Sequence, residues 1–158
     1  MNKQTTVVLA DAARARIFTV ETKRGQGGRD EPSLCEHVDL IQSGRRARPA
    51  EQLSESRPGT RRGGGSEHAV DDHRDARTEE ADRKFAGEVV REIGTFCGKH
   101  ASDRLLVVAP PRFLGHLKSR EFSGGQEVSY VGLDISDFTA SKALDHLTRH
   151  GHLKIDDN

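Results

Sequence analysis

The fold is decided by the stretch Val7-Val8-Leu9-Ala10-Asp11-Ala12-Ala13-Arg14-Ala15-Arg16-Ile17-Phe18. Residues 6–10 form a largely apolar, β-branched run, which is typical of an interior strand. Asp11 can accept hydrogen bonds from the backbone that follows it, which favours a turn. Residues 14–21 then form a second strand, with Arg14 and Arg16 on one face and Ala15 and Ile17 on the other. Because the two runs adjoin, we expect a β-hairpin.

The next segments extend this hairpin. Residues 23–32 carry three glycines and indicate a flexible loop, and residues 34–41 alternate as a third strand near an edge of the sheet. Residues 78–99 give the strongest helix pattern, with Thr78 as the N-cap. One face of that helix collects the apolar side chains Phe85, Ala86, Val89, Ile93, Phe96 and Cys97.

The last third of the chain predicts two more strands and two more helices. Residues 104–109 are continuously apolar, so we expect a central strand that accompanies the first one. Pro110-Pro111 should begin a helix that Gly124-Gly125 ends. Residues 127–133 alternate as a strand, and Ser141 should cap a final helix that ends at Gly151.

These elements predict one α/β domain over residues 1–158. Its mixed sheet would be built in the order strand, strand, strand, helix, strand, helix, strand, helix, with the helices packed on it. A long Arg/Gly-rich insertion loop is expected at about 43–77. Its first part, residues 44–66, holds six arginines and two glutamates, whereas residues 67–82 hold seven acidic residues and two arginines. We interpret it as a solvated loop whose two halves attract each other, or as a binding loop that its acidic half restrains.

The composition of the chain argues against several classes of function. Lys plus Arg equals Asp plus Glu, so the chain lacks the basic excess of a generic nucleic-acid binder. Cys35 and Cys97 form no CxxC motif and are expected to be free, buried thiols. The first residues lead directly into a strand without a signal-peptide core, and no run is long enough to span a bilayer. We therefore expect a cytoplasmic protein with no membrane partner.

Few residues suggest catalysis or metal binding. His68 and His73 are metal-ligand types within an acidic stretch, but no ordered zinc spacing accompanies them. Asp11 follows the first strand, where ribonuclease-H-like folds place a metal carboxylate, and Asp134 follows the last strand. A turn role is the simpler interpretation of both. The stretch Arg61–Ser66 lacks the Lys-Ser/Thr ending of a P-loop. We expect no metal, no cofactor and no assigned catalytic residue.

Several segments resemble the bacterial host attachment protein family. They are residues 8–18, Ser56-Arg57-Pro58-Gly59, residues 82–86 and Leu106-Val107-Val108-Ala109-Pro110-Pro111-Arg112-Phe113-Leu114-Gly115, with a looser match at residues 137–139. The family is similar to the middle domain of archaeal and eukaryotic-type peptide-chain release factors, which implies the same mixed α/β fold. Those factors carry a Gly-Gly-Gln loop before the long helix. Here residues 57–66 hold that place without a glutamine, and Gly124-Gly125-Gln126 comes after the second helix, so we assign Gln126 no hydrolytic role.

The resemblance and the local basicity together favour a non-enzymatic binding protein. Its polyanion contacts, to ribosomal or transfer RNA, are expected at Arg57, Arg61, Arg62, Gly63, Gly64, Gly65 and Arg112. The alternatives are an ester or phosphodiester hydrolase that uses Asp11 with a metal or the 63–66 loop, and a protein that attaches directly to host cells. The oligomeric state is not predicted.

Overall fold

The computed structural model describes residues 3–42, 67–122 and 124–155, with the side chains of α3 described from residue 75 onward. Within these residues, five strands and three helices follow one another in the order that the sequence predicts. In chain order they are β1 (Thr5–Ala10), β2 (Arg14–Arg24), β3 (Asp30–Ile41), α3 (Glu67–His100), β4 (Arg104–Ala109), α4 (Pro111–Lys118), β5 (Glu127–Gly132) and α5 (Ala140–Arg149).

The strands form one mixed sheet in the order β3-β2-β1-β4-β5. The predicted hairpin is confirmed, because β1 pairs antiparallel with β2 and places Val8 opposite Ile17. The predicted pairing of β1 with β4 is also confirmed, since the two strands run parallel with Val8 opposite Val107. β2 and β3 pair antiparallel, and β4 and β5 pair parallel. Residues 5–10 are all buried because β1 lies at the centre of the sheet.

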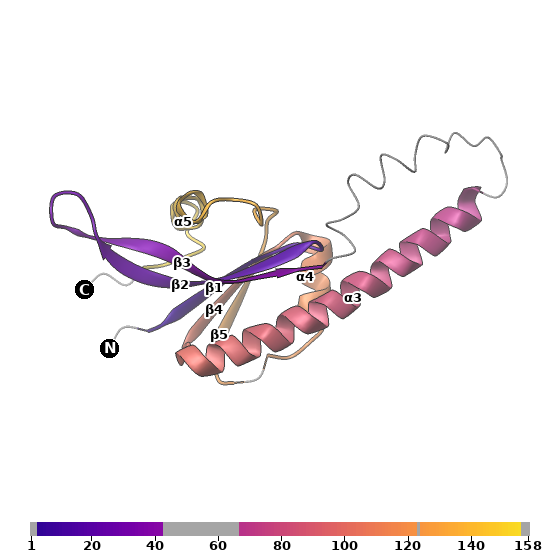
Figure 1. Cartoon of the computed structure of the whole chain (residues 1–158), viewed down its shortest axis with the longest axis horizontal. Coiled ribbons are helices and arrows are strands. Elements are labelled where there is room, and N and C mark those ends of the chain that lie inside the picture. Colours follow the sequence, from indigo (N-terminus) through magenta and orange to yellow (C-terminus); the bar gives the residue numbers. More distant parts are fainter. Residues whose placement is uncertain (1–2, 43–66, 123, 156–158) are drawn as a thin grey trace.

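Helices cover both faces of this sheet (Figure 1). Alternate residues of β1 divide between two apolar clusters, as the period of a strand requires. Val8 and Ala10 pack with α3 and α4 on one face, whereas Val7 and Leu9 pack with α5 on the other. The sheet is therefore the middle layer of a three-layer structure, and its interior strands read as continuous apolar runs because both of their faces are covered.

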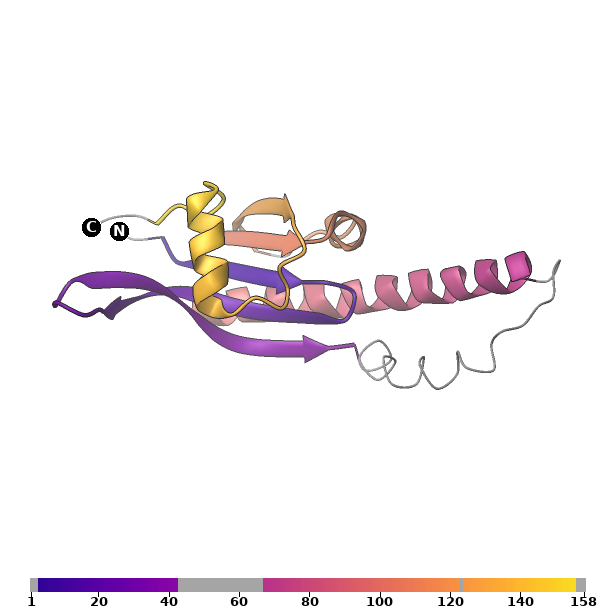
Figure 2. The same ribbon diagram turned by 90° about the horizontal axis from the view of Figure 1, so that it is seen from above.

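The long helix begins earlier than predicted. α3 starts at Glu67, so Thr78 is not its N-cap and residues 67–77 of the expected 43–77 loop are helical. Residues 43–66 of that loop lie outside the described residues. Figure 2 shows the N-terminal part of α3 projecting beyond the sheet. Among the side chains of α3 that the structure describes, those of residues 75–77 are exposed and Asp82 is the first that is buried. Exposed positions of this kind show no apolar periodicity.

Two predicted boundaries around the hairpin loop also shift. β2 extends to Arg24 and β3 begins at Asp30, so the expected loop at 23–32 is a short turn. Gly27 and Gly28 adopt φ values of 90° and 78° there. Glycine enters this region of backbone space without the steric penalty of a Cβ, which is why these positions allow the strands to pair almost to the turn.

The ends of the last two helices correct the remaining predictions. α4 ends at Lys118, ahead of Gly124-Gly125, and beyond it the Arg120 backbone N–H donates to the Leu117 carbonyl three residues back, which departs from the α-helical pattern. α5 is capped by Thr139, and not by Ser141, since the Thr139 side chain accepts a hydrogen bond from the Lys142 backbone N–H. Gly151 follows α5 with φ 75°, as predicted for the residue beyond a helix end. Among the described helices, none is long and apolar enough to cross a membrane.

Candidate functional site

The carboxyl ends of the parallel strands meet at one edge of the sheet, which we call the carboxyl edge. Asp11 follows β1, Pro110 follows β4 and Leu133 follows β5. The Leu133 backbone N–H donates to the Ala109 carbonyl, which keeps these strand ends together. Ligands of open α/β sheets bind outside the carboxyl ends of the strands, so a binding site is expected at this edge.

Asp11 organises the turn at this edge. One carboxylate oxygen accepts hydrogen bonds from the backbone N–H groups of Ala13 at 2.6 Å and Arg14 at 2.8 Å. The other oxygen accepts a bond from the Ser136 hydroxyl, which ties the hairpin to the segment after β5. The predicted turn role is confirmed. Neither Asp11 nor the exposed Asp134 belongs to the group of metal-ligand side chains that the described residues bring together.

Two residues that sequence analysis did not select complete the turn. The Gln42 backbone N–H donates to the Ala13 carbonyl at 2.9 Å, and its side-chain amide donates to the Ala12 carbonyl at 2.6 Å. The Gln42 amide also lies 3.5 Å from the carboxylate of Asp82, which is 6% exposed. Asp82 opens one of the segments that resemble the host attachment family, and Asp11 belongs to another. Segments distant in the sequence therefore converge at the carboxyl edge.

Arg112 is the one predicted polyanion-binding residue that the described part of the chain places. It lies in the first turn of α4, with its side chain 72% exposed, and its guanidinium donates to Glu79 of α3 at 2.7 Å. The other oxygen of Glu79 lies 3.3 Å from Nε2 of the nearly buried His116. The hydrogen bond from Arg112 lowers the pKa of Glu79, and the same bond raises the pKa of Arg112. Glu79 thus holds both α4 side chains against α3.

The start of α4 is suited to an anion. Pro110 occupies the N-cap position without a capping side chain, and the first turn holds no acidic residue. Pro110 and Pro111 have no N–H, so the first backbone donors at the positive end of the helix dipole are those of Arg112 and Phe113. Helix N-termini with these features bind phosphate and carboxylate groups. The other predicted contacts, Arg57, Arg61, Arg62, Gly63, Gly64 and Gly65, lie outside the described residues.

The Gly-Gly-Gln tripeptide lies at the opposite edge of the sheet. Gly124 adopts φ 106° just before β5. The backbone N–H of Glu127, the first residue of β5, donates to the Asp103 carbonyl that precedes β4. The tripeptide is therefore at the amino ends of the parallel strands, whereas Arg112 is at their carboxyl ends.

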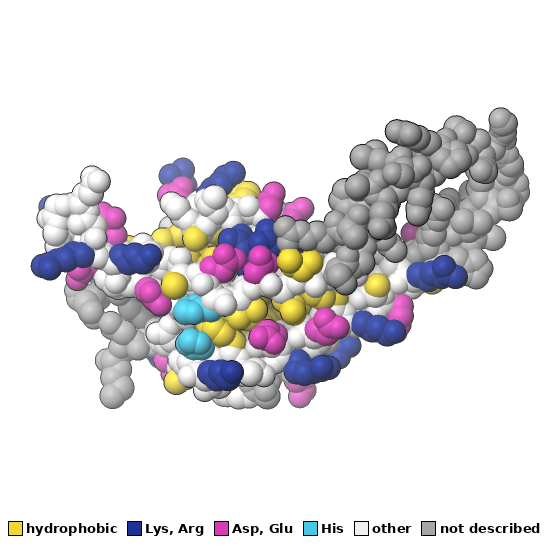
Figure 3. Space-filling view, viewed as in Figure 1, with side chains coloured by type: hydrophobic (Ala, Val, Ile, Leu, Met, Phe, Trp, Pro, Cys, Tyr) yellow, Lys and Arg dark blue, Asp and Glu magenta, His cyan; other side chains and the backbone are white. Residues whose placement is uncertain are grey.

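An open hollow of about 750 Å³ lies between α3 and the segment that follows α4, lined in part by Arg91 and Arg120. The Arg120 guanidinium donates to the Arg83 carbonyl at 3.3 Å. A Cβ on Gly87 would come within 3.0 Å of that guanidinium, so the glycine allows Arg120 to lie close to α3. Figure 3 shows basic and acidic side chains interspersed along α3, so the described surface in this view carries no patch of one sign.

Comparison with known proteins shows that the chain matches one protein family. Residues 6–124 match the family described as "Protein required for attachment to host cells". No curated protein matches the sequence. A matching solved structure is titled as the crystal structure of the Aquifex aeolicus member of the Ppx/GppA protein family, with 13% identity and a TM-score of 0.38. The match covers 82% of this chain but 36% of that one, and at this TM-score it carries no argument. These matches do not support the expected likeness to release factors.

Proposed function

The chain belongs to the family of proteins required for attachment to host cells, and we propose that it acts there as a non-enzymatic RNA-binding protein. The RNA phosphates would be held by Arg112 and by the arginines and glycines of residues 57–65. A role in attachment would then be indirect, through the RNA or ribosome that the protein binds. A cytoplasmic location, which the sequence predicts, is part of the same proposal.

One observation supports this proposal above the others. Arg112 lies 72% exposed at an uncapped helix start, at the edge where Gln42 hydrogen-bonds the β1–β2 turn. Gln42 is the last described residue before the arginine-rich segment, and it lies at the same edge as Arg112. The fifteen residues from Gln42 to Arg57 can span up to about 50 Å when extended. Chain length therefore lets Arg57 and Arg112 contact one RNA strand.

Glu79 is an internal competitor in this proposal. Its carboxylate accepts a hydrogen bond from the Arg112 guanidinium at 2.7 Å. An RNA phosphate would have to replace the carboxylate at this guanidinium. Since Arg112 is highly exposed, the competing pair is weak, and exchange for a phosphate is feasible. Replacing Glu79 by Gln removes a negative charge and the competitor together, so RNA binding should become tighter.

The proposal is tested by titrating the full chain into a fluorescent single-stranded RNA of mixed sequence over a series of salt concentrations. Arg112→Ala and the triple replacement of Arg57, Arg61 and Arg62 by Ala should weaken binding. They should also reduce the slope of log affinity against log salt by about 0.7 for each phosphate that the variant no longer neutralises. Glu79→Gln should strengthen binding.

Arg149→Ala is the matched control for Arg112→Ala. Arg149 is 73% exposed and pairs with Asp145 at 3.1 Å, but it lies on α5, on the other face of the sheet. It should bind RNA like the wild type. If the wild type shows no salt-dependent RNA binding, or if Arg149→Ala weakens binding as much as Arg112→Ala, the proposal is wrong.

The two alternatives have less support. A hydrolase that uses Asp11 with a metal needs free carboxylate oxygens, and both oxygens of Asp11 already accept hydrogen bonds. A hydrolase that uses residues 63–66, and direct attachment to host cells, gain no support from the described residues.

A further inference from the structure

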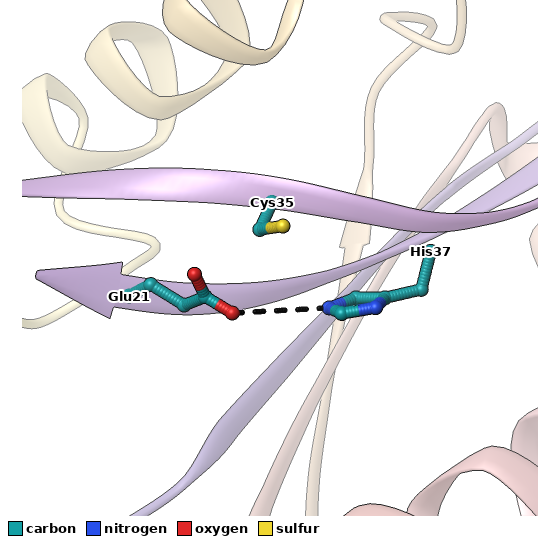
Figure 4. Close-up of side chains that lie close together, drawn as sticks. All are labelled: Glu21, Cys35 and His37. Carbon is teal, nitrogen blue, oxygen red and sulfur yellow. Dashed lines mark ion pairs between the residues drawn. The ribbon is translucent and has the colours of Figure 1, made fainter. Parts of the chain in front are cut away.

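Three side chains of metal-ligand type converge far from the carboxyl edge. Glu21 belongs to β2, Cys35 and His37 belong to β3, and one ligand atom of each lies within 4.8 Å of the others (Figure 4). Nε2 of His37 is 4.0 Å from a carboxylate oxygen of Glu21. A carboxylate, a thiol and an imidazole therefore point to one place from two neighbouring strands.

The strand register explains this convergence. Cys35 pairs with Thr19, so Glu21, two residues further along β2, shares the face of that pair. Along β3 the ladder passes from Glu36 opposite Phe18 to Val38 opposite Ile17, and His37 is the extra residue of a β-bulge. Bulges redirect side chains and recur beside functional sites. Here the bulge places the His37 ring over the side of the sheet that α3 covers.

The end of α3 fixes the His37 ring and adds a second imidazole. The His37 ring centroid lies 5.3 Å from that of Phe96 and 5.1 Å from that of His100, and Phe96 stacks on His100 at 4.0 Å. Phe96 is 6% exposed, so it provides a rigid apolar support for both imidazoles. Figure 3 shows histidine side chains at the surface beside the seam between the strands and α3.

The hydroxyl of Thr19 forms hydrogen bonds with both the His37 and the Glu21 side chains. Oγ1 of Thr19 lies 2.8 Å from Nε2 of His37 and donates to Glu21 at 3.1 Å. The hydroxyl orients the imidazole and the carboxylate toward a common point. A bound ion would replace the Thr19 hydroxyl at Nε2 of His37, because this nitrogen cannot bind both at once. The Glu21 and His37 side chains are 45% and 30% exposed, so an ion can enter from solvent.

We propose that Glu21, Cys35 and His37 bind a zinc ion, and that His100, which lies outside this group of three but beside the His37 ring, turns to complete the site. One sulfur, one oxygen and two nitrogen ligands suit zinc, whereas calcium and magnesium require oxygen ligands throughout. Metal–ligand distances of about 2.0–2.3 Å place tetrahedral ligands roughly 3.3–3.8 Å apart. A nitrogen and an oxygen ligand lie at the short end of this range, so the 4.0 Å separation of His37 and Glu21 must shorten by roughly half an ångström. Bound zinc would fasten the β2–β3 hairpin to the end of α3.

The test is titration of the metal-free full chain with zinc and, separately, with cobalt(II), whose absorption reports thiolate ligation. We expect one ion per chain and a thiolate-to-cobalt absorption band. Removing an outer partner of a zinc ligand already costs about 10–100-fold in affinity. Cys35→Ser, His37→Ala and His100→Ala should therefore each weaken zinc binding at least about 100-fold, and Cys35→Ser should abolish the band. Magnesium should not compete.

Alkylation of the thiols gives a second readout. Zinc should protect Cys35 from iodoacetamide. Cys97 is the internal control because it is buried, and burial raises the pKa of its thiol, so it should react slowly with or without zinc. Circular dichroism verifies that each variant folds; Cys35→Ser is nearly isosteric, so the proposal stays testable if His37→Ala does not fold.

Other histidines supply the control variants. His146, His150 and His152 lie near one another at the end of α5, with centroids of neighbouring rings 4.4 Å and 6.4 Å apart. Replacing all three by Ala should leave the cobalt band and the Cys35 protection unchanged. Zinc binding that survives both Cys35→Ser and His37→Ala, or that is lost on replacing the α5 histidines or His68 and His73, would overturn the proposal. So would the absence of stoichiometric binding by the wild type.

Discussion

Replacing Arg16 by Ala should destabilise the fold strongly. Arg16 is 8% exposed on β2, pairs with Glu36 and lies over the Phe18 ring at 4.9 Å. Its guanidinium also donates to the backbone carbonyls of Ser136 at 3.2 Å and Phe138 at 2.6 Å. These bonds hold the segment between β5 and α5 against the sheet, so the side chain connects parts of the chain that are distant in sequence.

The decrease in the free energy of unfolding depends on whether each hydrogen-bond partner of Arg16 can bond to water once Arg16 is replaced. Glu36 is 37% exposed and can be solvated, so it adds little. The Ser136 and Phe138 carbonyls are wholly or partly buried, and an unsatisfied buried polar group costs about 1–3 kcal/mol. When the weaker packing on Phe18 is included, we expect about 3–4 kcal/mol. Urea unfolding followed by circular dichroism measures it, since the chain has no tryptophan.

Arg14→Ala is the matched control. Arg14 stands two residues earlier on the same face of β2, and its guanidinium donates to Asp39 at 2.8 and 3.2 Å. The two side chains are 26% and 39% exposed, so the pair resembles surface salt bridges, which contribute about 0–1 kcal/mol. If the two variants lose stability within about 1 kcal/mol of each other, buried carbonyl satisfaction is not what Arg16 provides.

Asp11→Ala should cost about 1–2 kcal/mol in the same urea assay, because the carboxylate accepts two backbone N–H groups as an N-cap does; Asp11→Asn should keep most of that stability, and a full loss would contradict this account. Thr139→Ala should cost about 1 kcal/mol and Ser141→Ala at most about 0.5 kcal/mol, because Thr139 accepts the capping bond; thermal unfolding distinguishes them, and equal losses would refute the assignment of the cap. In Arg112→Ala the pKa of Glu79 should rise, because the Arg112 hydrogen bond is the largest cause of its lowering; carbon NMR titration of the carboxyl group measures it. A lowered pKa stabilises the folded state at pH above the pKa of the unfolded state, about 4.3, and this contribution is lost as pH falls through the pKa of the folded state. Stability of the variant should therefore depend less on pH in that acid range.

Apolar runs predicted the central strands of the sheet because a strand that is buried on both faces has apolar residues at consecutive positions. β1 and β4 lie next to each other in the middle of the sheet, and each reads as a continuous apolar run. The apolar face predicted for the long helix, from Phe85 to Cys97, is buried as expected. Near the start of α3, the described side chains of residues 75–77 are exposed, and exposed positions show no apolar periodicity. The helix boundary was therefore wrong by eleven residues.

The proposed zinc site could not be predicted for a different reason. Cys35 and His37 are separated by one residue on a strand, and this spacing forms no recognised zinc motif. Glu21 joins them only through the antiparallel register of β2 and β3, and His37 joins through the bulge in that register. Register is a tertiary property, and a slip of one residue would turn each side chain to the opposite face. Gln42 and Asp82 were missed likewise, because chain folding alone brings them to the turn at Asp11.

The two proposed sites share α3 and can be separated by experiment. Glu79 contacts Arg112 near one end of the sheet, and His100, twenty-one residues later on α3, contacts His37 toward the other. That spacing is about 32 Å along the helix axis, and no side chain belongs to both sites. Substitutions at such distances usually act independently, so His37→Ala should leave RNA binding unchanged, and Arg112→Ala should leave zinc affinity unchanged. A change in both would instead mean that zinc, by fastening the end of α3, biases the position of Glu79 and hence the availability of Arg112. Reciprocity would then require RNA to alter zinc affinity by the same factor.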